Sequence, residues 1–295
     1  MALTQAWADT APGTEAIPET PAQRVHGALR LSFVACASGH STLGRLFQRA
    51  PCRVLFPRVE AGDPVQAVLL TTSGGLTGGD QLDIALSVEP GAAACFATQA
   101  AEKLYRAEPD APATVIRIDL QVAGGAWAEW LAQETILFDQ SRLHRTTEIT
   151  LSGDARCLAV ESLVLGRQAM GETYSSGTLH DAWRIRRDGE LIWADAWHWD
   201  DPAEARGRAF ALGAYQALAT LLYAGRDAGD LLDAVRAELD VLDVEGGAGV
   251  HNDILIIRLL ATDATQLRRA VKQLAAHLRA QAGGCCNRMP QVWLC

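Results

Sequence analysis

Positively charged residues are scarce in this sequence. Lys and Arg total 26 against 35 Asp and Glu, which gives a formal net charge of −9. A surface of that average charge repels phosphate backbones, and the densest basic stretch, residues 184–187, is diluted by Asp181, Asp188 and Glu190. The charge balance therefore argues against nucleic acid as a partner.

Paired cysteine motifs are also missing. The seven cysteines are scattered, odd in number and include no CxxC pair, which suits reduced thiols better than a disulfide framework. Before Arg24 there is neither a Lys or Arg nor an apolar block, so no secretory signal peptide is expected. These features predict a cytoplasmic protein.

No hydrophobic run is long enough to cross a membrane. The uncharged stretch between Arg208 and Arg226 is shorter than the roughly 20 apolar residues that a span needs, and Gly213 and Gln216 dilute it. We expect a buried or partner-facing helix there and no membrane association. A hydrophobic fraction of 49% and a mean hydropathy of +0.04 indicate an ordinary globular chain.

The sequence from Gly27 to about Trp199 consists of short apolar runs divided by Gly, Pro and Asp. In Thr114–Leu120, Val115 and Arg117 alternate with Ile116, Ile118 and Leu120, which is the period of a half-buried strand. Turn signals every 10–15 residues or so favour a mainly β body, either stacked and β-helix-like or a sandwich. Further runs of this kind are Ala28–Ala37, Val65–Thr71, Leu82–Val88, Ala93–Thr98, Thr147–Leu151 and Leu158–Leu165.

Helical patterns begin after Asp200. Asp201-Pro202 followed by Glu204 resembles a helix start, and helices are expected over Asp230–Leu239 and from Asp263 to Gly283. Between the last two we expect a strand over Asp240–Val244, a turn at Gly246-Gly247 and a strand over Ile254–Leu259. The predicted organisation is a flexible leader (1–23), a β-rich body (24–200) and a helix-containing part packed on it through a small hairpin (201–295).

Catalytic and ligand-binding motifs are weak. Gly39–Leu46 has the glycine spacing of a phosphate loop but lacks its lysine and hydroxyl, and GxSxG is absent. Metal ligands occur near His198, near His251 and at Cys285-Cys286, without the paired spacing of a strong site. No metal site is therefore firmly assigned, and no tightly bound cofactor is expected.

Several carboxylates lie within or beside apolar stretches. They are Glu129, Glu134, Asp139, Glu161 and Glu172. Burying a charge costs several kcal/mol unless it is paired, so these side chains either form structural ion pairs or line a polar channel or interface.

Four segments, in order, resemble the urease accessory protein UreD (UreH) family. They are Gly74–Asp80 (GGLTGGD), Thr98–Arg106 (TQAAEKLYR), Glu129–Asp139 (EWLAQETILFD) and Gly166–Glu172 (GRQAMGE). The tail from Cys286 to Trp293 is also similar to the family's ending. The sequence departs from the family at Ser73, Glu102, Ala132 and Gln291, where proline, threonine, proline and arginine are usual.

This resemblance implies a non-catalytic maturation factor. Such a protein binds apo-urease with the F-type accessory protein and the G-type accessory GTPase, and it helps to deliver nickel to the urease active site. Ni²⁺ would pass transiently through an internal tunnel, where binding must be weak enough to release the ion. The candidate lining residues are Asp80, Asp139, Glu172, Glu134 and Thr98.

The resemblance also implies structural and docking residues. Motif residues expected to shape the fold are Gly74, Gly75, Gly78, Gly79, Lys103, Tyr105, Arg106, Gly166, Arg167 and Gly171. Residues expected to dock partners are Phe210, Tyr215, Leu222, Pro290 and Trp293, because apolar surface marks interfaces.

Two other functions are compatible with the residues. A β-rich hydrolase could use Glu134 and Glu172 as an acid–base pair, provided that both face one cleft with pKa values pushed apart. A general β binding module would need aromatic platforms, yet the tryptophans cluster mainly in 183–199 among strand-like apolar residues.

Overall fold

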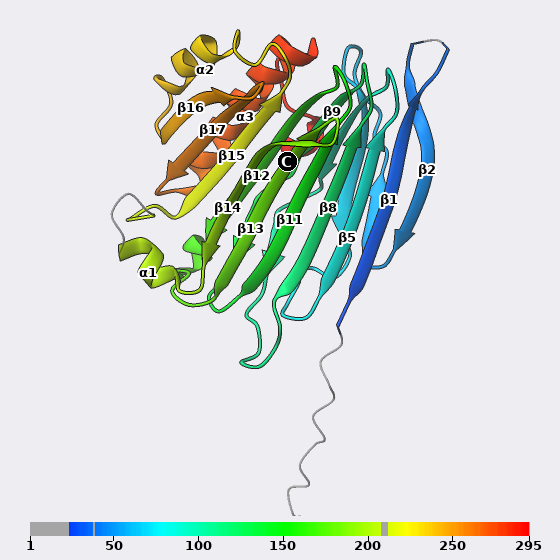
Figure 1. Cartoon of the computed structure of the whole chain (residues 1–295). Coiled ribbons are helices and arrows are strands. Elements are labelled where there is room, and N and C mark those ends of the chain that lie inside the picture. Colours follow the sequence, from blue (N-terminus) through cyan, green and yellow to red (C-terminus); the bar gives the residue numbers. More distant parts are fainter. Residues whose placement is uncertain (1–23, 38, 208–211, 295) are drawn as a thin grey trace, which may run out of the picture.

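The computed structural model describes residues 24–37, 39–207 and 212–294 (Figure 1). Within them, seventeen strands form two sheets and three α-helices lie in the C-terminal third. Sheet 1 has seven strands, in the order β14 (Glu190–Trp199), β13 (Thr178–Arg187), β11 (Arg142–Leu151), β8 (Thr114–Val122), β5 (Gln81–Val88), β1 (His26–Ala35) and β2 (Ser41–Arg49). The predicted leader, residues 1–23, lies outside the described residues.

Sheet 2 has ten strands. Its main path is β16 (Glu245–His251), β17 (Ile254–Ala261), β15 (Ala217–Ala224), β12 (Arg156–Leu165), β9 (Trp127–Leu131), β6 (Ala93–Thr98), β4 (Val65–Thr71) and β3 (Cys52–Leu55). The short strands β10 (Thr135–Leu137) and β7 (Glu102–Leu104) lie beside this path, since β10 pairs with both β12 and β7.

The chain coils between the two sheets. It passes from β4 in sheet 2 to β5 in sheet 1, then to β6, β8, β9, β11, β12 and β13, changing sheet each time. Strands one coil apart pair in parallel, as β4 with β6 and β5 with β8. The expected mainly β fold is therefore confirmed, with the stacked arrangement and the sandwich arrangement present together.

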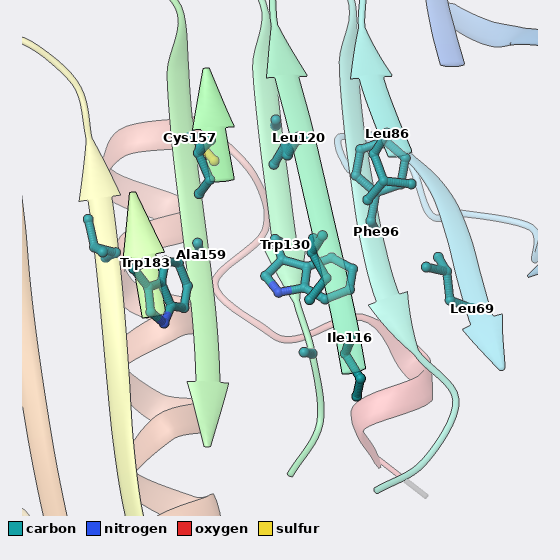
Figure 2. Packing of buried hydrophobic residues seen from close by; sticks show 14 of the residues in the cluster. Leu69, Leu86, Phe96, Ile116, Leu120, Trp130, Cys157, Ala159 and Trp183 are labelled. Carbon is teal, nitrogen blue, oxygen red and sulfur yellow. The ribbon is translucent and has the colours of Figure 1, made fainter. Parts of the chain in front are cut away.

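Two apolar layers hold the structure together. The first lies between the sheets, where Leu86, Ile116 and Leu120 of sheet 1 face Phe96 and Trp130 of sheet 2 (Figure 2). Ile116, Ile118 and Leu120 are all buried, as the alternation predicts. The second layer lies between sheet 2 and α3 (Ala264–Gly283), so the order through the molecule is sheet 1, sheet 2, helix.

The C-terminal helices follow the sequence signals closely. Asp263 caps α3 by accepting hydrogen bonds from the N–H groups of Thr265 (2.7 Å) and Gln266 (3.0 Å). The left-handed residue that ends the helix is Gly284, one position after the expected glycine. The predicted helix at Asp230 is α2 (Leu232–Leu239), and that at Asp201 is α1 (Pro202–Gly207).

Three local predictions are wrong. The described part of the uncharged stretch after Arg208 contains the strand β15 and no helix. Residues 240–244 form turns and bends instead of a strand, and Gly246-Gly247 lies inside β16 instead of forming a turn. β15, β17 and β16 extend sheet 2 next to β12, and the division at residue 200 stays a prediction.

No helix among the described residues is both long and apolar enough to cross a membrane.

Candidate functional site

The four family-like segments meet at one edge of sheet 2. Each lies at the carboxyl end of a parallel strand: residues 74–80 after β4, 98–106 after β6, 129–139 after β9 and 166–172 after β12. Because parallel strands point the same way, their carboxyl ends share one edge of the sheet. The regular coil thus brings together segments that are far apart in sequence.

Backbone hydrogen bonds join these segments into a ladder. Leu76 N–H donates to the Lys103 carbonyl (2.8 Å), and Tyr105 N–H donates back to the Leu76 carbonyl (2.7 Å). Glu102 N–H donates to the Glu134 carbonyl (2.8 Å), and Gly166 N–H donates to the carbonyl of Leu137 (2.8 Å). We call residues 74–80, 98–106, 133–139 and 166–172 the motif edge.

Two glycines of the motif edge are required by close contacts. At Gly75 (φ +157°) a Cβ would lie 2.6 Å from the Tyr105 ring, and at Gly166 (φ +89°) it would lie 2.5 Å from the Glu172 carbonyl oxygen. Both distances are far inside van der Waals contact. Side chains of other types rarely adopt these positive φ angles, so any substitution strains the backbone as well. At both positions the backbone conformation and the close neighbours therefore favour glycine.

Arg167 and Glu172 form an exposed ion pair on the motif edge. The guanidinium donates to both carboxylate oxygens, at 2.8 Å from Nε and 2.7 Å from Nη2, and lies 4.4 Å from the centre of the Phe138 ring. Hydrogen bonding by Arg167 lowers the pKa of Glu172. The Tyr105 ring packs edge-on against Phe138 at 5.1 Å, and its hydroxyl donates to the Gly74 carbonyl (2.8 Å). The cluster fixes the shape of this edge.

Asp80 and Asp139 hold turns together. Asp80 is buried and accepts hydrogen bonds from the N–H groups of Val25 (2.9 Å) and Thr77 (2.8 Å). Asp139 accepts from the N–H groups of Ser175 (2.8 Å) and Ser176 (2.9 Å). Partial burial alone would raise the pKa of Asp139, but these donors hold it below the ordinary value.

Glu134 and Thr98 also have local partners. Arg268 of α3 contacts both oxygens of the Glu134 carboxylate at 2.8 Å, and Thr98 Oγ1 accepts from Gln133 N–H (2.8 Å). The backbone N–H of Asp139 also helps to lower the pKa of Glu172, so Asp139 and Glu172 lie close together. Glu134 faces α3 instead.

A cavity of about 230 Å³ opens next to the motif edge. It is lined by Gly74, Thr98, Glu102 and Lys103 together with apolar residues of both sheets. The Glu102 carboxylate accepts a hydrogen bond from Thr71 Oγ1 (3.1 Å), and burial raises the pKa of Glu102 to about 7. The sequence prediction missed Glu102 as a site residue, although it had marked it as a departure from the family.

A charged group lies between the two sheets. Arg145 of β11 donates to both oxygens of Asp181 (2.9 and 2.6 Å) and lies 3.1 Å from Glu161. All three are at least 95% buried. Burial and the nearby Asp181 raise the pKa of Glu161 to about 7, against the opposing charge of Arg145. Arg145 also donates to Thr135 (3.0 Å), whose strand partner is Glu102.

A second buried group lies between sheet 2 and α3. Arg279 Nε donates to both oxygens of Glu129 (3.0 and 3.1 Å), and its Nη2 donates to Asp63 (3.1 Å). Glu129 also accepts from Trp127 Nε1 (3.1 Å). Glu129, Glu134 and Glu161 are thus all buried, and each contacts an arginine.

The sequence contains a pattern that predicts burial of Arg145 and Asp181. Each occupies an inward position in an alternating strand, Arg145 between Leu143 and Thr147 and Asp181 between Leu179 and Trp183. A charge at an inward position predicts a buried ion pair. The helical period gives Arg279 a similar signal, because it lies four positions after Ala275 and three before Ala282 on the buried face of α3. No such pattern points to Asp63.

Three of the expected docking residues are buried. Leu222 and Trp293 are 1% exposed, and Pro290 is also buried. Leu222 lies in the core between the two sheets, and Trp293 donates from Nε1 to the Leu131 carbonyl (3.1 Å). Neither therefore forms a docking surface in this structure. Tyr215 is half-buried, and Phe210 lies outside the described residues.

The structure gives little support to the metal-site and hydrolase hypotheses. Among the described residues, no three His, Cys, Asp or Glu side chains converge to hold a metal ion. Glu134 and Glu172, the acid–base pair of the hydrolase hypothesis, are each bound by a different arginine. The lowered pKa of Glu172 is also the opposite of what a general acid needs at neutral pH.

Comparisons with known proteins agree with this architecture. A model of the family described as UreD urease accessory protein matches residues 25–294. The urease accessory protein UreD of Magnetococcus marinus is 44% identical, covering 92% of this chain and 95% of the relative. Those of Paracoccus denitrificans (41%; 96% of each) and Mesorhizobium japonicum (40%; 97% and 99%) are similarly related.

These matches define the class as urease accessory proteins. The chain belongs to the UreD family.

Proposed function

We infer that this chain is a non-catalytic urease maturation factor. It binds apo-urease together with the F-type and G-type accessory proteins and passes Ni²⁺ through its interior toward the urease active site. Ni²⁺ is cargo here, and no tightly bound cofactor takes part. The free thiols of the described cysteines fit a reducing compartment, and we place this activity in the cytoplasm.

The observation that carries this proposal is a line of oxygen ligands leading inward from the motif edge. It begins at Glu102 in the cavity, continues through Thr135 on the neighbouring strand, and reaches Glu161 and Asp181 between the sheets. Here two carboxylates share one arginine, so the group carries an excess negative charge whenever Glu161 is ionised. Oxygen ligands suit a divalent cation. Because Arg145 already contacts the oxygens of Asp181 and Glu161, Ni²⁺ binds to them only weakly.

The nickel step can be tested by co-expressing urease and the other accessory proteins with or without this chain. Bound nickel in purified urease is then measured by mass spectrometry. We expect low nickel without the chain, and reduced nickel with Glu102→Gln, which keeps the side-chain size. Glu190→Gln, at an exposed strand end, is the matched control. Full nickel loading without the chain would refute the maturation role, whereas full loading with Glu102→Gln would refute only the passage.

Protein binding is supported by an exposed apolar surface at the edge of sheet 1. β2 is the edge strand, and its Leu46 and Phe47 are 40% and 50% exposed. Leu55, which ends β3 at the edge of sheet 2, and the following Phe56 are similarly exposed. Apolar patches of this kind mark interfaces, and an edge strand can pair with an added strand.

The charge of this surface indicates its partner. In a chain of net charge −9, Arg45 and Arg49 lie on β2 and Arg30 lies beside them on β1. Arg30 lies over the Phe47 ring (5.8 Å) and Arg49 donates to the His26 carbonyl (2.7 Å), and neither forms a direct ion pair with a carboxylate of the described residues. The partner segment is therefore an acidic, partly apolar one. A second copy of this chain would place arginines against arginines.

Substitution at this edge tests the docking proposal. Leu46→Glu combined with Phe47→Glu should abolish co-purification with one of the three partners, apo-urease, F-type or G-type protein. Val241→Glu, on an apolar residue elsewhere that is even more exposed (74%), should leave all three unchanged. Undiminished co-purification of every partner with the double variant would remove β2 as the docking strand.

A further inference from the structure

Three histidines form a row on the outer face of sheet 1. His144 of β11 lies opposite His180 of β13, which lies opposite His198 of β14. Their neighbours Leu143 and Leu179 are buried in the core, so the imidazoles point away from sheet 2. The ring centres of His144 and His180 are 4.5 Å apart, and those of His180 and His198 are 5.5 Å apart.

We propose that this histidine row binds a divalent cation of borderline softness, such as Ni²⁺ or Zn²⁺, through adjacent pairs of imidazoles. With metal–nitrogen bonds of about 2.1 Å and ring centres about 1 Å beyond the nitrogen, imidazoles at neighbouring coordination positions have centres about 4–5 Å apart. The separations in the row match this spacing at the first pair and come close to it at the second.

The imidazoles are available as ligands. His144 and His198 are exposed, and His180 is half-buried. The rings of His144 and His198 have no hydrogen-bond partner among the described residues. Nε2 of His198 lies 3.8 Å from Oδ2 of Asp200. Neutral imidazole with a free nitrogen is the form that coordinates transition metals.

Charged side chains flank the row at both ends. Arg117 of β8 lies near His144 and is itself held by Asp83 (3.1 Å). At the other end, the carboxylate of Asp200 favours a bound cation.

The arrangement predicts weak, exchangeable binding. No three ligand side chains converge among the residues that the structure describes, so an ion has two imidazole ligands and water in its other positions. His180 belongs to both pairs, whereas His144 and His198 belong to one each. An ion can thus move between the pairs without leaving the row.

This site goes beyond the proposed function, because it lies on the outer surface and not along the interior line of carboxylates. Its metal binding needs no partner protein. It can therefore be present or absent whatever the outcome of the urease nickel-loading experiment.

Calorimetric titration of the tag-free full chain with Ni²⁺ tests the site. His180→Ala removes both pairs and should weaken this binding by at least about tenfold, as loss of a direct ligand exceeds the 10–100-fold effects of outer-shell changes. His144→Ala and His198→Ala each leave one pair and should retain a site. His251→Ala, an exposed histidine on β16, is the matched control and should change nothing.

Folding of each variant is checked by its thermal unfolding, and His180→Gln repeats the test with a side chain closer in size. Equal Ni²⁺ stoichiometry and affinity in the wild type and in both His180 variants would overturn the proposal. Loss of the site in His144→Ala or His198→Ala alone, with the other pair intact, would overturn the paired arrangement.

Discussion

Replacing Glu102 with glutamine should stabilise the folded chain at high pH and have a small effect at low pH. The Glu102 carboxylate lies in the cavity next to the motif edge, where burial raises its pKa from the ordinary 4.5 to about 7. Glutamine keeps the size and can still accept the hydrogen bond from Thr71, but it carries no charge to bury.

The sign follows from proton binding in the two states. Below pH 4.5 the carboxyl is protonated whether the chain is folded or not, so burial costs little. Between pH 4.5 and 7 the folded state binds more proton than the unfolded state, and stability falls as the pH rises. Above pH 7 the loss is complete, at 1.36 kcal/mol for each unit of the shift from 4.5 to about 7, or about 3 kcal/mol.

Urea unfolding at pH 5 and pH 8 measures this difference. The gain in unfolding free energy of Glu102→Gln over wild type should be under about 1 kcal/mol at pH 5 and about 2–3 kcal/mol at pH 8. Glu190→Gln at an exposed strand end should show no such change between the two pH values. An equal effect of Glu102→Gln at both pH values would refute the claim that the carboxylate is buried at a cost.

Three further changes test the packing. Arg279→Ala leaves the Glu129 charge buried and unpaired and should lower the unfolding free energy by about 3–5 kcal/mol in urea titration, with Glu129→Gln in the same chain restoring part of it. Trp293→Ala removes a fully buried side chain and should cost about 3–5 kcal/mol, whereas a cost below about 1 kcal/mol would contradict its burial. Gly166→Ala places a Cβ against the Glu172 backbone at φ +89° and should lower the melting temperature, while Gly153→Ala, also at positive φ but with open space around it, should cost less.

The strands of the coil could be predicted where one face is buried and the other is wet. β8 alternates Ile116, Ile118 and Leu120 with polar residues, because only one of its faces meets the core. β15 has no such alternation. Sheet 1 residues cover one of its faces and α3 covers the other, so all eight of its residues are buried and its uncharged sequence resembles a buried helix.

The family-like segments could be found from the sequence, but the contacts of their acidic side chains could not. A motif identifies Asp80 and Asp139 as acidic, and only the structure shows that each caps backbone N–H groups. Trp293 is a second example. It was expected to dock a partner, whereas in the structure it is buried and donates a hydrogen bond to the Leu131 carbonyl. Long-range contacts of this kind leave no local periodicity.

Residues after Ala264 neutralise carboxylates that occur much earlier in the chain. Arg279 pairs with Asp63 and Glu129, and Arg268 pairs with Glu134. A nascent chain that has reached only α2 therefore holds these acids without their arginines, and the outer face of sheet 2 has no helix over it. Such an unfinished chain exposes apolar strands to chaperones and proteases. The fold is therefore complete only after α3 and the tail that carries Trp293 have left the ribosome, and a truncation before α3 should destabilise the whole chain.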